Sequence, residues 1–224
     1  MNRRPNPVPR LSGLDWDNLP AVAEAAAATF DALTRDNWGL VAELLDRLPG
    51  TPELVAMCEQ FDFLDKLLLH QDDDFRVRLH RFRTGYYDRP HDHRWSFASM
   101  LLTGSYVHVQ YGTNEGFETI DPADLVPRQI RTERAGDQYV LHHTAVHSVT
   151  AAPGTISLVL RGPAAKDSFR IIDAPSGDSF TARGSQFETP DQRVAKRMQP
   201  SAITTTIADI LAARPAISTE GAPK

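Results

Sequence analysis

The chain has 224 residues, of which 41% are hydrophobic, 24% charged and 8% aromatic, so we expect one sizeable core with helical additions rather than two full domains. Its 24 basic and 29 acidic residues give a net charge of -5, which argues against nucleic acid or an anionic membrane surface as the main partner. The single cysteine, Cys58, excludes an internal disulfide and a thiolate zinc site. Any metal must therefore be held by nitrogen and oxygen ligands, and eight histidines supply the nitrogen.

The opening stretch, residues 1–13, contains arginines and prolines but no apolar run after them, so we expect no secretory signal and a cytoplasmic location. No segment approaches the roughly 20 consecutive apolar residues that span a bilayer. Even the alanine-rich run 21–28 is interrupted by Glu24. We therefore expect a soluble protein with a small-molecule partner.

Helical periodicity characterises the first third of the chain. Apolar residues spaced three and four apart predict two helices, over 19–33 and 38–48. Thr51 and Pro52 predict a third helix, because a capping residue precedes a proline at the first helical position. Residues 61–70 extend this helix or begin another. We expect residues 1–73 to form an N-terminal helical segment.

From Phe75 onward the hydrophobic period drops to two, which is typical of half-buried strands. After a first strand that begins at Phe75, β-rich runs alternate with turn signals over residues 95–102, 105–111, 117–120, 138–141, 146–151, 156–160 and 169–172. Many short strands at this spacing indicate a barrel or sandwich, which we place at 74–175. Weaker helical patterns predict a C-terminal extension, residues 176–224, that packs on the barrel with helices over 190–198 and 202–213.

The histidines are clustered. Seven of the eight lie between His80 and His147, and five of those fall within 91–93 and 142–147. Residues two apart on a strand point to the same face, so His91 and His93 present both imidazoles to one side, as a chelating pair requires. His147 begins another β-like run and supplies a third ligand from an adjacent or facing strand. Surface histidines are the simpler interpretation of the first pair alone, and the second cluster favours a metal site.

Two spacings carry a family resemblance. Gly85 is followed by five residues and then by His91-Asp92-His93, with Gly104 closing the segment, and Gly136 is separated from His147 by ten residues. These residues resemble the two motifs of the cupin superfamily, although the proline and the second glycine of the second motif are absent. The resemblance covers about residues 75–172. It implies a mainly β fold, a cupin jelly-roll barrel, with the three histidines as metal ligands inside it.

The cupin pattern also suggests the metal. Many cupins place a metal-binding glutamate four residues after the second histidine, where this chain has Phe97. A three-histidine set leaves a divalent ion with open positions for a bidentate substrate plus O2 or water. Cupins of this type include thiol dioxygenases and β-diketone dioxygenases, which use ferrous iron. The resemblance therefore implies Fe(II), while zinc, nickel and manganese also suit imidazole ligands.

The resemblance to thiol dioxygenases does not extend to thiol oxidation as the reaction of this protein. The Ser-x-His-x-Tyr signature of the thiol dioxygenases aligns with Ser157 to Arg161, where only the serine matches, and the position of their crosslinking cysteine is Ala98. Residues 91–97 are also similar to a family of uncharacterised bacterial cupins with His-Asp-His-Pro-Trp-Asp-Phe, which supplies a fold without a substrate.

Further site residues follow from strand parity. Trp95, Phe97 and Ser99 share parity with His91 and His93, so we expect them to shape the substrate pocket, with a purely packing role as the alternative. The first strand carries Arg76 and Arg78 on one face, together with His80, and Arg81 and Arg83 on the other. We expect one of these arginines, with Arg81 as our choice, to clamp a substrate carboxylate. A charged edge strand is the alternative explanation.

Three more residues are candidates for catalysis. Arg161 lies in an otherwise apolar strand and needs a partner, which is either the substrate or an ion pair with Glu133 or Asp137. His143 has the parity of His147 and is predicted to be a fourth ligand or a proton donor. Tyr106 is predicted to donate a hydrogen bond to bound oxygen species, with packing as its other role.

Together these features predict a mononuclear non-haem iron cupin oxygenase, dioxygenase-like, that uses O2 on a small polar or carboxylated molecule. Barrel edges in this architecture favour a homodimer. Two alternatives stay open. One is a non-redox cupin in which zinc, nickel or manganese acts as a Lewis acid in a lyase, isomerase or condensation reaction. The other is a binding or regulatory cupin without catalysis.

Overall fold

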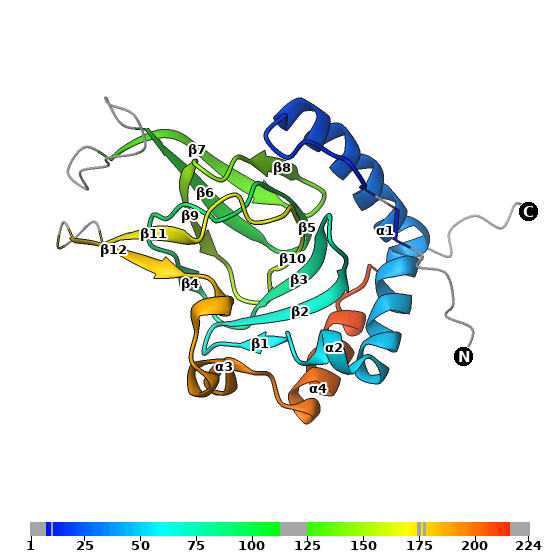
Figure 1. Cartoon of the computed structure of the whole chain (residues 1–224). Helices are drawn as coiled ribbons and strands as arrows, with labels where there is room; N and C mark the ends of the chain where they lie inside the picture. The colour runs from blue at the N-terminus through cyan, green and yellow to red at the C-terminus, as the bar shows by residue number, and fades with distance from the viewer. Residues whose placement is uncertain (1–7, 10, 113–124, 174–175, 177, 216–224) are drawn as a thin grey trace, which may run out of the picture.

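The computed structural model describes residues 8–9, 11–112, 125–173, 176 and 178–215. Figure 1 shows two β-sheets stacked on one another, with the long N-terminal helix along one side and the C-terminal helices below. The helices are α1 (Leu19–Arg47), α2 (Pro52–Val55), α3 (Pro190–Lys196) and α4 (Pro200–Ala212). The strands are β1 (Glu59–Gln60), β2 (Leu64–Gln71), β3 (Arg76–Phe82), β4 (Tyr86–Tyr87), β5 (Phe97–Thr103), β6 (Ser105–Gly112), β7 (Val126–Arg134), β8 (Gln138–Leu141), β9 (Val146–Ala151), β10 (Ile156–Arg161), β11 (Ser168–Asp173) and β12 (Asp178–Arg183).

The order of the strands defines the fold. One sheet runs β1-β2-β3-β10-β5-β8 and the other runs β4-β9-β6-β7, with β11 and β12 as a separate hairpin. Strand β3 pairs with β10, β4 with β9, β5 with β8, and β6 with β7, all antiparallel. This nested pairing is that of a long hairpin folded over into a double-sheet jelly roll, the architecture that cupins use. The predicted fold class is confirmed.

The main hydrophobic core lies outside the barrel, between the helices and the larger sheet. Along β3, Val77 and Leu79 are fully buried in this core, and Phe30 and Leu45 of α1 pack in the same cluster. The alternate residues of the strand point to the opposite face, into the barrel. The helices cover one face of the larger sheet, and the inner face carries polar residues such as Arg78 and His80 beside apolar ones such as Phe82.

Helix α1 consists of two helical stretches. Asn18 caps its start by accepting a hydrogen bond from the backbone N–H of Ala21. The backbone leaves the helical conformation from Arg35 to Trp38, which agrees with the two separate helices that the apolar spacing predicts. Helices α3 and α4 also lie where they were predicted. None of the helices in the described ranges is long and apolar enough to cross a membrane.

Several sequence predictions were wrong in detail. Residues 61–70 were expected to be helical, but they contribute to β2, whose Leu67 and Leu68 are both buried because the strand is covered on two sides. The third helix is only the four residues of α2. The segment before residue 74 is thus not wholly helical, since β1 and β2 belong to the larger sheet. Strands β7 and β12 were not predicted, and the strand expected at 117–120 lies outside the described residues.

Candidate metal centre

Three histidines converge inside the barrel. His91 and His147 exchange backbone hydrogen bonds of 2.9 Å in both directions, which fixes the segment before β5 against the start of β9. His93 follows two residues later and presents its ring to the same side. One ligand nitrogen from each of His91, His93 and His147 lies within 4.8 Å of the others. The fold therefore brings together the three histidines that were predicted to bind a metal.

The spacing of two of these nitrogens matches that of neighbouring metal ligands. His93 Nε2 and His147 Nε2 are 2.8 Å apart. Two imidazole nitrogens bound at right angles to one divalent ion, each about 2.1 Å from it, would be separated by about 3.0 Å. The pair is thus close to the separation that a shared ion imposes.

His91 is oriented by the loop that precedes it. Its Nδ1 lies 2.9 Å from the carbonyl oxygen of Arg89 and 3.2 Å from a carboxylate oxygen of Asp88. Both partners are acceptors, so Nδ1 carries the proton and donates it. Nε2 is then the unprotonated nitrogen, the one that is able to bind a metal.

His147 is oriented by a buried series of hydrogen bonds that ends at Glu133. Its Nδ1 lies 3.0 Å from Nε2 of His108, and Nδ1 of His108 lies 3.2 Å from Oε1 of Glu133. The carboxylate can only accept, so His108 donates from Nδ1 and accepts at Nε2, which in turn requires His147 to donate from Nδ1. The lone pair of His147 Nε2 therefore points toward His93. Such outer hydrogen bonds commonly fix metal-ligating histidines.

Burial keeps the imidazole rings of His93, His108 and His147 neutral. It lowers the pKa of His93 and of His147 well below the ordinary value of 6.5, with the nearby His91 as the second cause. Burial also lowers the pKa of His108, against the opposing effect of Glu133. A metal binds the deprotonated imidazole, so neutral rings at neutral pH are ready to act as ligands without losing a proton.

A cavity of about 650 Å³ opens beside the three histidines, a size typical of small-molecule sites. Trp95, Phe97 and Ser99 line it, as their strand parity predicts. The Phe97 ring lies 4.7 Å from that of His93 and 5.9 Å from that of His147. No carboxylate from the described part of the chain joins the three-histidine group, which agrees with the absence of the usual cupin glutamate.

Tyr106 lines the same cavity and donates a hydrogen bond of 2.8 Å to the hydroxyl of Tyr139. Burial raises the pKa of Tyr106 well above 10 and that of Tyr139 to about 12. Both hydroxyls therefore keep their protons at neutral pH. Tyr139 also packs on His108, with 4.5 Å between ring centroids. The role of Tyr106 toward oxygen stays a prediction.

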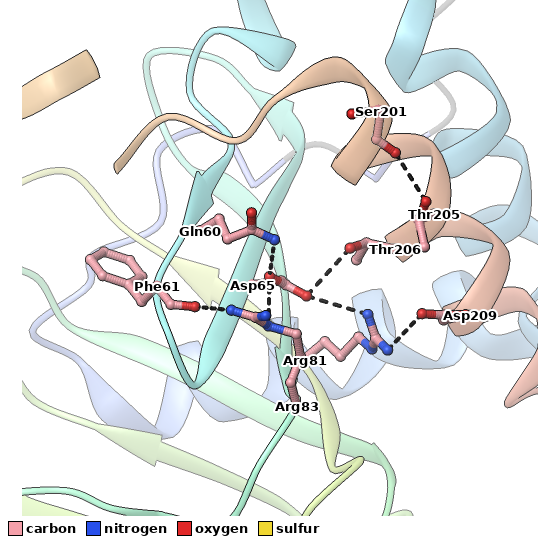
Figure 2. A network of polar contacts seen from close by, with 9 residues as sticks. All are labelled: Gln60, Phe61, Asp65, Arg81, Arg83, Ser201, Thr205, Thr206 and Asp209. Carbon is pink, nitrogen blue, oxygen red and sulfur yellow. Dashed lines mark hydrogen bonds and ion pairs between the residues drawn. The ribbon is translucent and has the colours of Figure 1, made fainter. Parts of the chain in front are cut away.

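Arg81 was the wrong arginine for this cavity. Its guanidinium lies 3.3 Å from Asp65 and 2.7 Å from Asp209 of α4, and Figure 2 shows this network between the sheet and α4. Arg83 and Thr206 also bond to Asp65. The odd residues of β3 face the helices, whereas the even ones, Arg76, Arg78, His80 and Phe82, line the cavity.

His143 does not join the three-histidine group. Its side chain lies 3.4 Å from Ser96 Oγ and 3.5 Å from Asp17, and it forms a separate group with Asp17 and His142. The turn at residues 142–145 breaks the strand, so the parity of His147 does not extend back to His143. Of the two neighbouring histidines, neither is a fourth ligand in this arrangement.

Arg161 lines the cavity and has neither of the two ion-pair partners that we considered. Glu133 pairs instead with His108 and Arg131, and Asp137 accepts from the backbone of Arg134. The sequence analysis assigned neither His108 nor Glu133 to the orientation of His147. The alternation along β6 was the signal that could have placed His108 behind His147, because His108 and Tyr106 share one face.

No protein-family model and no curated protein match the chain. Among solved structures, KdgF from a Halomonas species is 16% identical, over 47% of this chain and 86% of its own, with a TM-score of 0.37. An RmlC-like cupin from Shewanella frigidimarina is 20% identical, over 49% of this chain and 86% of its own, with a TM-score of 0.37. The DMSP lyase DddQ from Ruegeria pomeroyi is 15% identical, over 48% of this chain and 51% of its own, with a TM-score of 0.37.

The chain has a cupin-type fold. This follows from its own nested strand pairing and from the three histidines gathered inside the barrel. The histidine group is able to hold a metal, because all three side chains offer a nitrogen to one point and at least two are fixed in the tautomer that a metal requires.

Proposed function

We propose that this protein is a mononuclear metal-dependent cupin enzyme, a non-haem iron oxygenase that uses O2 on a small polar or carboxylated molecule. The observation that carries the proposal is the convergence of His91, His93 and His147 on a cavity of small-molecule size, with ligand nitrogens that lie close to one another. A purely structural role for three histidines would not require their lone pairs to converge.

The donor set suits ferrous iron. Three neutral imidazoles with no carboxylate leave the full positive charge of a divalent ion and, in an octahedral arrangement, three positions for other ligands. Ferrous iron, when bound, would supply the binding and activation of O2. Zinc, nickel and manganese are also compatible with imidazole, so the choice of iron is a proposal that metal analysis must test.

The surrounding side chains have defined tasks in this proposal. Phe97 and Trp95 pack against the ring of His93 and would limit the access of water to it. The Glu133–His108 pair holds the ring of His147 and keeps the proton on its Nδ1. Tyr106 and Tyr139 hold protons in the cavity wall, where their hydroxyls are able to hydrogen-bond a substrate.

Oxygen consumption tests the oxygenase assignment. The protein is purified without oxygen, its metal content is measured, and it is then loaded separately with iron, zinc, nickel or manganese. An oxygen electrode records uptake with thiols, amino acids and diketones. The proposal expects uptake with the iron form and its loss in His147→Ala, with full activity in the matched surface variant His142→Ala. If no metal-loaded form took up oxygen with any of these substrate classes, the result would contradict an oxygenase.

A non-redox cupin is the second candidate, because the same carboxylate-free histidine set accommodates zinc, nickel or manganese as a Lewis acid. Turnover of a substrate in the absence of O2, with one of these ions bound, would favour this candidate over the oxygenase. A protein that carries no metal, and gains no thermal stability from any of the four ions, would instead indicate a binding cupin without catalysis.

A further inference from the structure

Three arginines share the inner face of the larger sheet. In the register of β3 and β10, Arg161 lies directly opposite Arg76, and Val159 lies opposite Arg78. Side chains two apart on a strand point to the same side, so all three guanidinium groups face the barrel interior. Each of them lines the cavity that contains the histidines.

This arrangement is unfavourable without a counter-charge. Like charges directly opposite on neighbouring strands repel one another. Burial, followed by the charges of neighbouring arginines, lowers the pKa of Arg161 to about 8 and that of Arg76 to about 10. A buried charge normally persists in a fold only when it is paired.

The described residues neutralise the cluster only in part. Glu59 is 3.9 Å from Arg78 but is also held by Lys196 at 2.7 Å. Arg161 is 7% exposed; its Nη1 donates to the carbonyl of Gly162, and its guanidinium lies 4.1 Å from the Trp95 ring. Neither of these partners carries a negative charge. Among the described residues, the buried Nε atoms of Arg78 and Arg161 have no hydrogen-bond partner.

Two aromatic side chains lie between Arg161 and the histidines. The ring of Trp95 lies under the guanidinium of Arg161 and 6.2 Å from the ring of His93. Phe97, the residue opposite Arg161 across β5 and β10, packs on His93 as well. A ligand bound to the arginines at one end would therefore meet the three histidines at the other.

We propose that Arg78 and Arg161, assisted by Arg76, form a subsite for an oxyanion group of the substrate, and that the rest of the molecule extends past Trp95 to the three histidines. Carboxylate, sulfonate and phosphate share the chemistry that two guanidinium groups recognise, which is a set of oxygens that accepts paired N–H donors. The inference that the other end of the substrate reacts at the three histidines rests on the proposed function. Binding of the anion does not, because it needs no metal.

Calorimetric titration of the metal-free protein tests this subsite. Inorganic phosphate, sulfate and malonate serve as the probes, and the probe that binds most tightly identifies the oxyanion. Arg161→Gln and Arg78→Gln should each weaken binding by about 10-fold or more, whereas Arg134→Gln, an exposed matched control, should bind like the wild type. Equal affinity in the wild type and both cavity variants, or no binding of any probe, would overturn the proposal.

Thermal unfolding separates a ligand-binding role from a structural one. An unneutralised arginine destabilises the unliganded fold, so Arg161→Gln should raise the melting temperature without anion and should lose the anion-induced increase that the wild type shows. A lower melting temperature together with retained anion binding would show a structural role instead. His147→Gln separates this proposal from the oxygenase: it should lose metal binding and keep anion binding, and loss of both would count against an independent subsite.

Discussion

His108 Nε2 lies 3.0 Å from His147 Nδ1, with Glu133 at the far side of His108. This hydrogen bond determines which nitrogen of His147 is unprotonated. The Glu133 carboxylate can only accept, so His108 donates to it from Nδ1 and accepts at Nε2 from His147 Nδ1. Removing the acceptor should therefore weaken metal binding without touching a ligand. His108→Phe should lower metal affinity by about 10- to 100-fold, as measured by competition with a chromophoric chelator.

A matched control is Tyr139→Phe, which keeps a ring against His108 and removes only a hydroxyl that is not part of this series of hydrogen bonds. Its metal affinity should stay close to that of the wild type. If His108→Phe bound metal as tightly as Tyr139→Phe, the series of hydrogen bonds would not orient the ligand.

Phe97 stands where other cupins carry a glutamate, against the rings of His93 and His147. Phe97→Glu should destabilise the metal-free protein by about 1–3 kcal/mol, because the new carboxyl is buried without a partner. Added metal should then raise the melting temperature more in this variant than in the wild type, because the carboxylate becomes a fourth ligand. Phe97→Leu is the control, and an identical metal-induced shift in both variants would exclude the ligand role for this position.

His80 lines the same cavity as the three histidines and provides a pH-dependent test at a residue outside the ligand group. Burial, then the charges of Lys66 and Arg78, lowers its pKa well below 6.5, and its Nε2 has no partner among the described residues. Below about pH 6.5 the unfolded chain takes up a proton at this position and the folded protein does not, so the free energy of unfolding falls as the pH falls. The fall extends down to the lowered pKa of the folded state.

The variant His80→Phe should remove this contribution to the pH dependence of the free energy of unfolding. The contribution is about 1.4 kcal/mol per pH unit between pH 6.5 and the lowered pKa of the folded state. Chemical denaturation of the metal-free protein at several pH values between 7 and 5 measures the slope. The same slope in the variant and the wild type would mean that His80 ionises normally in the fold.

Asp65 holds the C-terminal helix on the sheet. It is fully buried and bonds to Arg81, Arg83 and Thr206 (Figure 2). Asp65→Asn should destabilise the protein by about 3–5 kcal/mol, since it leaves two arginine side chains without their buried carboxylate. Denaturant unfolding measures this loss. Asp31→Asn, which breaks only an exposed pair with Arg35 on α1, should leave stability nearly unchanged.

The sequence was sufficient to predict the barrel and its three histidines because both depend on short-range periodicity. An alternation of two places His91 and His93 on one side of the chain, and the spacing from Gly136 to His147 resembles the second cupin motif. The same alternation correctly placed Trp95, Phe97 and Ser99 along the cavity. These inferences need no knowledge of which strands are neighbours.

Features that depend on tertiary contacts were beyond this reasoning. Parity separates Arg76 and Arg78 from Arg81, but only the position of the helices shows which face is the interior. Strand β2 is buried on both faces and so lacks the alternation that marks a strand. The contact of His108 with His147 depends on the pairing of β6 with β9, whose residues are distant in the sequence.

Metal content after anaerobic purification tests the central claim most directly. Plasma emission spectrometry on the wild type, His147→Ala and His142→Ala compares the barrel group with the separate group formed by Asp17, His142 and His143. The three-histidine centre predicts about one bound ion per chain in the wild type and in His142→Ala, and almost none in His147→Ala. Full metal occupancy in His147→Ala, with correct folding verified by circular dichroism, would contradict the assignment.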